Sequence, residues 1–185
     1  MAADAAALIR RNGTDPEIAP RPALHTPQRI WTHGEVYAEA RRYAALFAER
    51  LPAGGPPHVG VLADNIPEYL FTFAGAALVG ATVVGLNPTR QGEHLLRDIH
   101  HAAVGLLLSE AAHDVDLEPI RGDLGLPVLR AGEELEAALP AAAEDTGIEP
   151  GPDTQWALIF TSGTSAAPKA VICTQRRLLV TGNRM

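Results

Sequence analysis

The apolar residues of this chain occur in two patterns. Some form short continuous runs, and others recur at helical spacing in the longer stretches that separate these runs. The runs show no period-two alternation, which is typical of strands buried on both faces of a sheet. Runs of this kind occupy residues 58–63, 82–86, 104–108, 128–129, 156–160 and 171–173. We therefore predict a sheet built from several buried strands.

The stretches between the runs predict helices. Thr32 is the expected N-cap of the best-defined one, since Glu35 three residues later completes a capping box and apolar residues follow at helical spacing to Leu51. The other predicted helices are residues 1–11, 68–79, 91–101 and 133–139, with a further helix start at residue 174. Strands and helices alternate, which predicts the α/β class: a parallel or mixed sheet with helices on both faces.

Four segments are expected along the chain. Residues 1–30 form an N-terminal helix and an extended, irregular arm, because residues 12–28 contain four prolines. Residues 31–139 form an α/β subdomain, residues 140–152 an acidic linker, and residues 153–185 the start of a second subdomain.

Composition and charge exclude several classes. The net charge is −7; residues 151–185 hold one acidic and four basic side chains, so they carry +3 and the first 150 residues carry −10. An acidic body does not suit general nucleic-acid binding. The 17 uncharged residues 70–86 contain three glycines, so we expect a buried helix and strand there and no membrane span. The single cysteine permits no intrachain disulfide, and we expect a cytoplasmic protein without a signal peptide.

The main candidate for chemistry is the stretch of small and hydroxyl-bearing residues that ends at Lys169, the only lysine in the chain. Small residues let a ligand approach the backbone, while N–H groups, hydroxyls and an ammonium donate to anionic oxygens. An ordinary P-loop is excluded, because Pro168 precedes the lysine and Ala170 follows it. Composition alone would also fit a plain loop between two strands.

The order of residues 160–175 resembles the signature of the adenylate-forming, or AMP-binding, enzymes, and most closely that of fatty-acid–CoA ligases and other acyl-CoA synthetases. That signature is Tyr/Phe-Thr-Ser-Gly-Thr-Thr-Gly-x-Pro-Lys-Gly-Val followed by Thr-His, and this chain has FTSGTSAAPKAV followed by TQ. Residues 31–35, 58–68 and 80–89 are also similar to family segments. Ala166, Ala170 and Gln175 replace two glycines and the histidine of the signature; an alanine at positive φ would be strained by about 1 kcal/mol.

The resemblance implies a reaction and its cofactors. Such enzymes activate a carboxylate, here a long-chain fatty acid, with ATP and Mg²⁺ to an acyl-adenylate, and CoA then takes the acyl group. The implied ATP phosphate-binding residues are Thr161, Ser162, Gly163, Thr164, Ser165, Ala166, Ala167, Pro168 and Lys169.

The chain is expected to be the N-terminal part of such an enzyme. The family's metal-binding and catalytic residues lie beyond the position of Met185, so we assign no catalytic or metal-binding residue and expect no adenylation by this chain alone. A C-terminal portion is then its expected partner. The alternatives are a non-catalytic nucleotide- or partner-binding module, such as one half of a split enzyme, and a structural protein without a ligand.

Other reactive residue types have simpler interpretations. His100 and His101 are adjacent on a predicted helix and are expected at the surface, and the other histidines lack ligand spacing. Cys173 is expected to be buried. Arg176 and Arg177 fit a surface pair, with contact to phosphate or CoA as the alternative.

Overall fold

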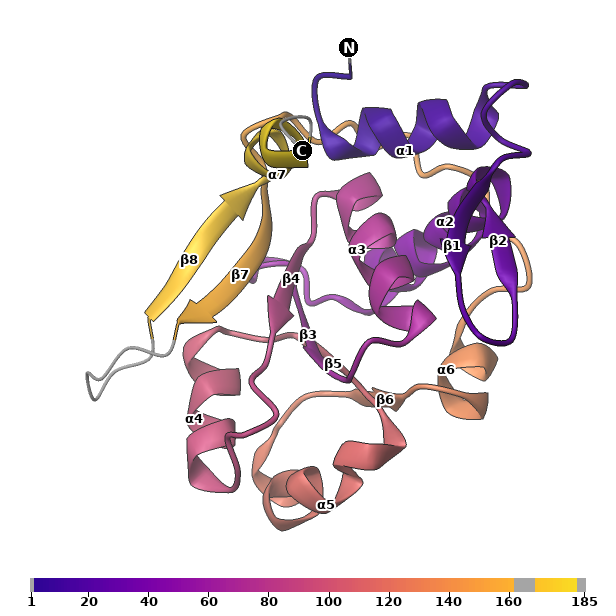
Figure 1. Ribbon diagram of the computed structural model, residues 1–185. Helices are drawn as coiled ribbons and strands as arrows, with labels where there is room; N and C mark the ends of the chain where they lie inside the picture. Colours follow the sequence, from indigo (N-terminus) through magenta and orange to yellow (C-terminus); the bar gives the residue numbers. More distant parts are fainter. Residues whose placement is uncertain (1, 162–168, 183–185) are drawn as a thin grey trace.

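A six-stranded sheet forms the centre of the part of the chain that the computed structural model describes, residues 2–161 and 169–182 (Figure 1). The strand order is β6-β5-β3-β4-β7-β8, and neighbours are parallel except for the antiparallel pair β7 and β8. The strands are β3 (His58–Leu62), β4 (Thr82–Gly85), β5 (Leu106–Ser109), β6 (Val128–Arg130), β7 (Gln155–Thr161) and β8 (Lys169–Thr174). The predicted α/β class with a mixed sheet is confirmed.

Helices α2 (His33–Arg50), α3 (Pro67–Val79) and α6 (Glu133–Ala138) pack on one face of the sheet. The predicted capping box at the start of α2 is present: Thr32 Oγ1 accepts the Glu35 N–H at 3.2 Å, and Glu35 Oε2 accepts the Thr32 N–H at 2.7 Å. Side chains from both layers form the core: Tyr43, Phe47, Val59, Val61, Phe71, Val83, Leu106, Leu108 and Leu135.

A glycine sets the close contact between α2 and α3. A Cβ at Gly75 would lie 2.5 Å from the Cβ of Tyr43 and 3.0 Å from the carbonyl oxygen of Ala40. Such separations are too short for a side chain, so the two helices can approach this closely only because residue 75 has none.

The opposite face is covered by α4 (Glu93–His101), α5 (Asp114–Leu117) and the 3₁₀ segment η2 (Glu118–Asp123). Their buried side chains, with strand residues Leu62, Val84 and Leu107, form a second cluster containing Leu95, Ile99, Leu117, Ile120 and Leu124. After β3 the chain crosses one face of the sheet in α3. After the adjacent strand β5 it crosses the opposite face in α5 and η2. In doubly wound sheets this reversal marks the topological switch point, where ligands usually bind.

The N-terminal region is more regular than predicted. Helix α1 (Ala5–Thr14) starts at Asp4, whose side chain accepts the Ala7 N–H at 2.8 Å, and packs on α2 and α3. Strands β1 (Pro22–His25) and β2 (Ile30–Thr32) then form an antiparallel hairpin. The expectation of an irregular arm was wrong for residues 22–25, because Leu24 packs against the core and pairing with β2 outweighs the local effect of the prolines.

The predicted linker contains no helix or strand, yet it is fixed to the body. Asp145 accepts hydrogen bonds from Arg10 of α1 at 2.7 and 3.1 Å and from the hydroxyl of Tyr37 of α2 at 2.8 Å. Residues 70–86 form most of α3 and then β4, as predicted. Among the residues that the structure describes, no helix has the length and apolar character needed to cross a membrane.

Candidate functional site

The first and last of the predicted phosphate-binding residues, Thr161 and Lys169, lie at the end of β7 and the start of β8. Ala157 of β7 is the parallel partner of Val83 in β4, and Thr161 is the antiparallel partner of Lys169. The carboxyl end of β7 therefore lies at the same edge of the sheet as the carboxyl ends of β3, β4 and β5, the edge at which open α/β sheets bind ligands. Residues 162–168 lie outside the described part of the chain, so the structure places only the backbone of the two ends, Thr161 and Lys169.

Contacts with the rest of the fold hold this hairpin in position. The indole N–H of Trp156 donates to the carbonyl oxygen of Phe73 in α3 at 2.9 Å. Cys173 is buried, as predicted. Arg176 forms an exposed ion pair with Asp153 at 3.1 Å, which agrees with the surface interpretation of that arginine.

Ala170, which stands in place of a signature glycine, has an ordinary strand conformation. It pairs with Phe160 in the ladder between β7 and β8, and it is exposed. Among the described residues the non-glycine with positive φ is Ala103, at 48°. Ala170 therefore carries no strain of the kind considered above, while Ala166 falls outside the described residues.

Gln175, which replaces the signature histidine, has a structural role that the sequence did not indicate. It opens α7 (Gln175–Gly182) and is fully buried. Its Oε1 accepts the Ala6 N–H at 3.0 Å, and its Nε2 donates to the Ala77 carbonyl oxygen at 3.0 Å. The amide thus joins α7 to α1 and α3. The partners are 169 and 98 residues away in sequence, so no local pattern could have identified them.

A cleft of about 420 Å³ lies along β7, beside the described end of the hairpin. Tyr69 and Phe73 of α3 form one wall, with their rings stacked at 5.5 Å, and Phe73 meets Trp156 edge-on at 5.7 Å. Burial raises the pKa of the Tyr69 phenol above its ordinary value. The remaining lining residues are Gly85, Leu86, Asn87, Pro88, Ala157, Leu158, Ile159 and Phe160.

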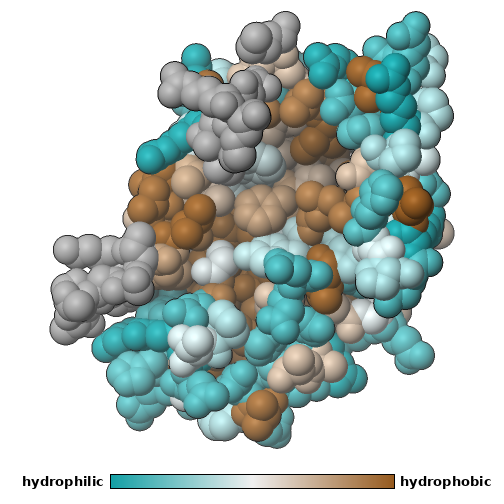
Figure 2. Space-filling view, in the orientation of Figure 1, coloured by the Kyte–Doolittle hydropathy of each residue, from teal (hydrophilic) through white to brown (hydrophobic). Residues whose placement is uncertain are grey.

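A second cleft, of about 660 Å³, shares Tyr69 and Phe73 with the first and extends between α3 and the β1–β2 hairpin. Leu24, Ile66 and Leu70 contribute to its lining, which is mainly apolar. Figure 2 shows apolar side chains gathered across this face of the molecule, from the β7–β8 hairpin toward α3. The two clefts therefore form one surface that extends from β7 across α3 to the β1–β2 hairpin.

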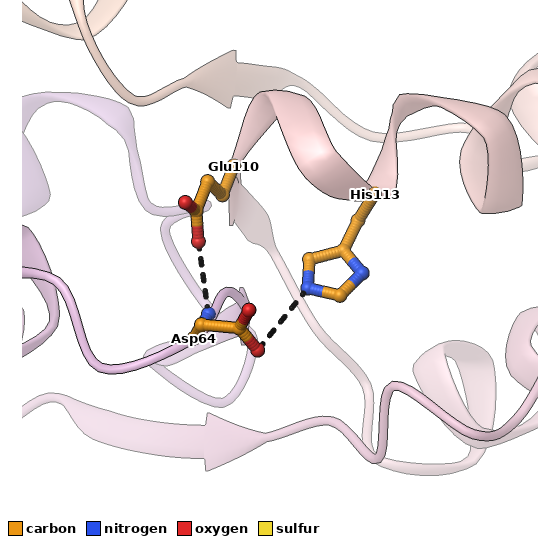
Figure 3. Close-up of side chains that lie close together, drawn as sticks. All are labelled: Asp64, Glu110 and His113. Carbon is orange, nitrogen blue, oxygen red and sulfur yellow. Dashed lines mark hydrogen bonds and ion pairs between the residues drawn. The ribbon is translucent and has the colours of Figure 1, made fainter.

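The structure also brings together three side chains that the sequence analysis did not connect: Asp64, Glu110 and His113 (Figure 3). Asp64 follows β3 and Glu110 follows β5, and these strands are parallel neighbours. In the sequence, each of these two carboxylates follows a predicted strand. This pattern could have indicated the group only if β3 and β5 had been known to be neighbours. His100 and His101 are exposed, as predicted.

Comparison with known proteins identifies the relatives of this fold and site. The family model described as "AMP-binding enzyme" matches residues 16–185. Steroid-22-oyl-CoA synthetase of Rhodococcus jostii (strain RHA1) is 41% identical in an alignment of 180 positions that covers 92% of this chain and 31% of that protein. Medium/long-chain-fatty-acid–CoA ligase FadD17 of Mycobacterium marinum is 37% identical over 142 residues, 77% of this chain and 28% of that protein. The chain thus spans less than a third of these relatives.

Solved structures agree on the fold. The N-terminal domain of FACL13 from Mycobacterium tuberculosis superposes with a TM-score of 0.80 at 24% identity, covering 94% of this chain and 44% of that one. A fatty acyl CoA synthetase from the same organism gives a TM-score of 0.80 at 22% identity, covering 94% of this chain and 35% of that one. The architecture described above is therefore that of the N-terminal region of such proteins.

Proposed function

Because the chain belongs to the AMP-binding enzyme family, we propose that it forms the part of an acyl-CoA synthetase that holds the phosphates of ATP. The observation that supports this most strongly is the position of the signature. Phe160 and Thr161 end β7 at the edge of the sheet where open α/β sheets bind ligands, and β8 begins there at Lys169, so both described ends of the signature lie at that edge. A loop placed there can present its N–H groups and hydroxyls to an anion.

The proposed reaction has two steps. A carboxylate oxygen of the substrate attacks the α-phosphorus of ATP, which breaks the bond to the β-phosphate and releases pyrophosphate. The thiol of CoA then attacks the acyl carbon and displaces AMP. In this proposal the hydroxyls of Thr161, Ser162, Thr164 and Ser165 donate to the β- and γ-phosphates, and Lys169 stabilises the negative charge that develops on pyrophosphate.

The composition of the loop fits ATP better than it fits a metal ion. Residues 160–175 include no aspartate or glutamate, so this segment supplies donors for phosphate oxygens and no carboxylate for Mg²⁺. Mg²⁺ would then be held by the phosphates themselves. CoA and a cytoplasmic location are parts of the same proposal, since the related proteins are named as CoA synthetases and the chain has a single, buried cysteine.

The proposed substrate is a carboxylic acid with a large apolar group, such as a fatty acid. Two observations support it: relatives are named for steroid and fatty acids, and the two clefts share Tyr69 and Phe73 and have aliphatic side chains in their lining. The alternative is a module that binds nucleotide or a partner without turnover.

The lone lysine offers a direct test of phosphate binding. An amine-reactive acetylating reagent can modify only Lys169 and the α-amino group, and mass spectrometry resolves the two sites. We expect Mg-ATP to slow acetylation of Lys169 several-fold while the α-amino group, the internal control, reacts at an unchanged rate. Equal labelling of Lys169 with and without Mg-ATP would contradict the proposed site.

An ATP–pyrophosphate exchange assay separates the enzyme from the binding module. We expect no exchange with the chain alone and measurable, carboxylate-dependent exchange when the remaining segments of a close relative are added as a second chain. ATP protection of Lys169 without exchange in either mixture would favour the binding module.

A further inference from the structure

The group formed by Asp64, Glu110 and His113 lies at the topological switch point between β3 and β5, away from the β7–β8 hairpin in the strand order. One ligand atom from each side chain lies within 4.8 Å of the other two. Glu110 Oε2 accepts the Asp64 N–H at 3.0 Å, and His113 Nε2 lies 3.8 Å from Asp64 Oδ1 (Figure 3). Two carboxylates and an imidazole therefore converge on one small volume.

His113 is the distinctive member of the group. The residue is 8% exposed, and its buried Nε2 has no hydrogen-bond partner among the described residues. A polar atom in this state costs free energy unless something binds it. Because Nε2 faces the Asp64 carboxylate, the missing partner is one that both groups can share.

The other ring nitrogen of His113 indicates what that partner is. Nδ1 lies 3.4 Å from Asp116 Oδ2, and Asp116 is held in turn by the Gln91 amide, which donates to its Oδ1 at 2.8 Å. Donation from Nδ1–H to Asp116 leaves a lone pair on Nε2, directed at the two carboxylates. The arrangement of carboxylate, histidine and metal is common in metalloproteins, where it orients the ring and raises its basicity.

The local charge also favours a cation. In the part of the chain that the structure describes, neither Asp64 nor Glu110 forms an ion pair with an arginine, and Arg130 close by is paired with Asp114 at 2.7 Å. Three acceptor atoms thus converge with no protein cation between them.

We propose that Asp64, Glu110 and His113 bind one divalent transition-metal ion, with Asp116 orienting the histidine. One nitrogen and two oxygen ligands suit Zn²⁺ or Mn²⁺ better than Ca²⁺ or Mg²⁺, which prefer oxygen ligands alone. Ligands of a tetrahedral zinc are about 3.3 Å apart, so the group must contract slightly. Asp64 can make this movement, because its side chain is 71% exposed and leaves room for a water ligand.

The ion would link two turns that follow neighbouring strands, the one from β3 into α3 and the one from β5 into η1 (Ala111–His113). Metal bound only by the folded chain raises its stability, so the thermal midpoint should rise with added metal. The site is independent of the proposed phosphate loop and would be present whether or not the chain binds ATP.

Calorimetric titration of the intact chain with Zn²⁺, and separately with Mn²⁺ and Mg²⁺, tests the proposal. We expect one saturable Zn²⁺ site and a loss of affinity of at least tenfold in each of the variants Asp64→Asn, Glu110→Gln and His113→Asn. Asp116→Asn should weaken binding about tenfold, since it removes only the orienting bond. In ¹⁵N NMR of the histidine rings, Zn²⁺ should shift Nε2 of His113 far more than Nδ1.

The controls are a histidine and a carboxylate outside the group. His101→Asn and Glu118→Gln, both at exposed positions, should leave Zn²⁺ affinity unchanged. If His113→Asn fails to fold, Asp64→Asn still decides the matter, because Asp64 is exposed. Zn²⁺ affinity that is unchanged in Asp64→Asn and Glu110→Gln, or lost in His101→Asn, would overturn the proposal, as would a saturable Mg²⁺ site that is tighter than the Zn²⁺ site.

Discussion

The side-chain amide of Gln175 joins three helices that are far apart in the sequence. Both polar ends are used, by the Ala6 N–H and the Ala77 carbonyl oxygen, and the side chain is fully buried. Glutamine in place of the signature histidine therefore does more than remove an imidazole ring, because its amide attaches α1 to α3 and α7.

We predict that Gln175→Ala destabilises the chain. Removing the amide leaves a buried N–H and a buried carbonyl oxygen without partners, which costs about 2–4 kcal/mol of unfolding free energy in total. Urea denaturation followed by circular dichroism measures it. The control Gln28→Ala, at an exposed position, should change the free energy by less than about 0.5 kcal/mol. A Gln175→Ala chain as stable as the wild type would show that water replaces both bonds.

Residue-level predictions from the sequence succeeded where the determinants are local. Thr32 and Glu35 are three positions apart and their capping box is present. The roles of Gln175 and His113 depend on partners brought close by the folded sheet, so neither could be derived from the pattern around it.

At the scale of elements, the apolar runs located the strands of the central sheet because each has little polar content, and β3, β4 and β5 are buried on both faces. The β1–β2 hairpin was missed because its strands have four and three residues and the first begins with a proline. Residues 109–127 were given no element, since α5 and the 3₁₀ segments beside it are too short for a helical period to show.

The segment predicted as a linker behaves as part of the body, because Asp145 attaches it to α1 and α2. Bonds from Arg10, the Tyr37 hydroxyl and the Gly147 N–H keep the pKa of the Asp145 carboxyl well below its ordinary range, with Arg10 the main cause. A carboxyl whose pKa is lower in the folded chain than in the unfolded chain stabilises the folded chain. This contribution is fully present above the unfolded pKa of about 4, and it is lost as the pH falls from there through the folded pKa.

We therefore predict a pH-dependent effect of Asp145→Asn. At pH 7 the variant should be about 1–2 kcal/mol less stable than the wild type, because the ion pair is partly exposed. The difference should become smaller below pH 4, where the Asp145 carboxyl of the unfolded chain takes up a proton while that of the folded chain is still ionised. Urea denaturation at pH 7, 5 and 3.5 measures this difference. Glu144→Gln, which alters a fully exposed neighbour, should show almost no difference at any pH. A constant gap between wild type and Asp145→Asn would contradict the assigned charge.

At the scale of the whole molecule, the parallel strands have helices on both sides, whereas the β7–β8 hairpin extends beyond this cover (Figure 1). Ile159 is 50% exposed and Ile172 is 55% exposed. Their cross-strand partners are Val171 and Leu158 respectively, so the two isoleucines lie on opposite faces of the hairpin. The fold could be anticipated from the sequence, but these exposed apolar side chains could not, because a run such as residues 156–160 has the composition of a fully buried strand.

The exposed isoleucines should make the 185-residue chain associate with itself at high concentration, since apolar patches on a strand at the sheet edge favour pairing. The double variant Ile159→Thr with Ile172→Thr keeps β-branched side chains, so the hairpin should persist while its apolar surface shrinks. Sedimentation velocity over a range of concentrations should show less association for this variant than for the wild type.

The control Val115→Thr changes an apolar residue that is 75% exposed on α5, and it should leave association unaltered. If the control reduces association as much as the double variant does, exposed apolar residues promote association wherever they lie, and the hairpin has no special part in it. If only the hairpin variant reduces it, the hairpin is the surface through which the chain associates with itself.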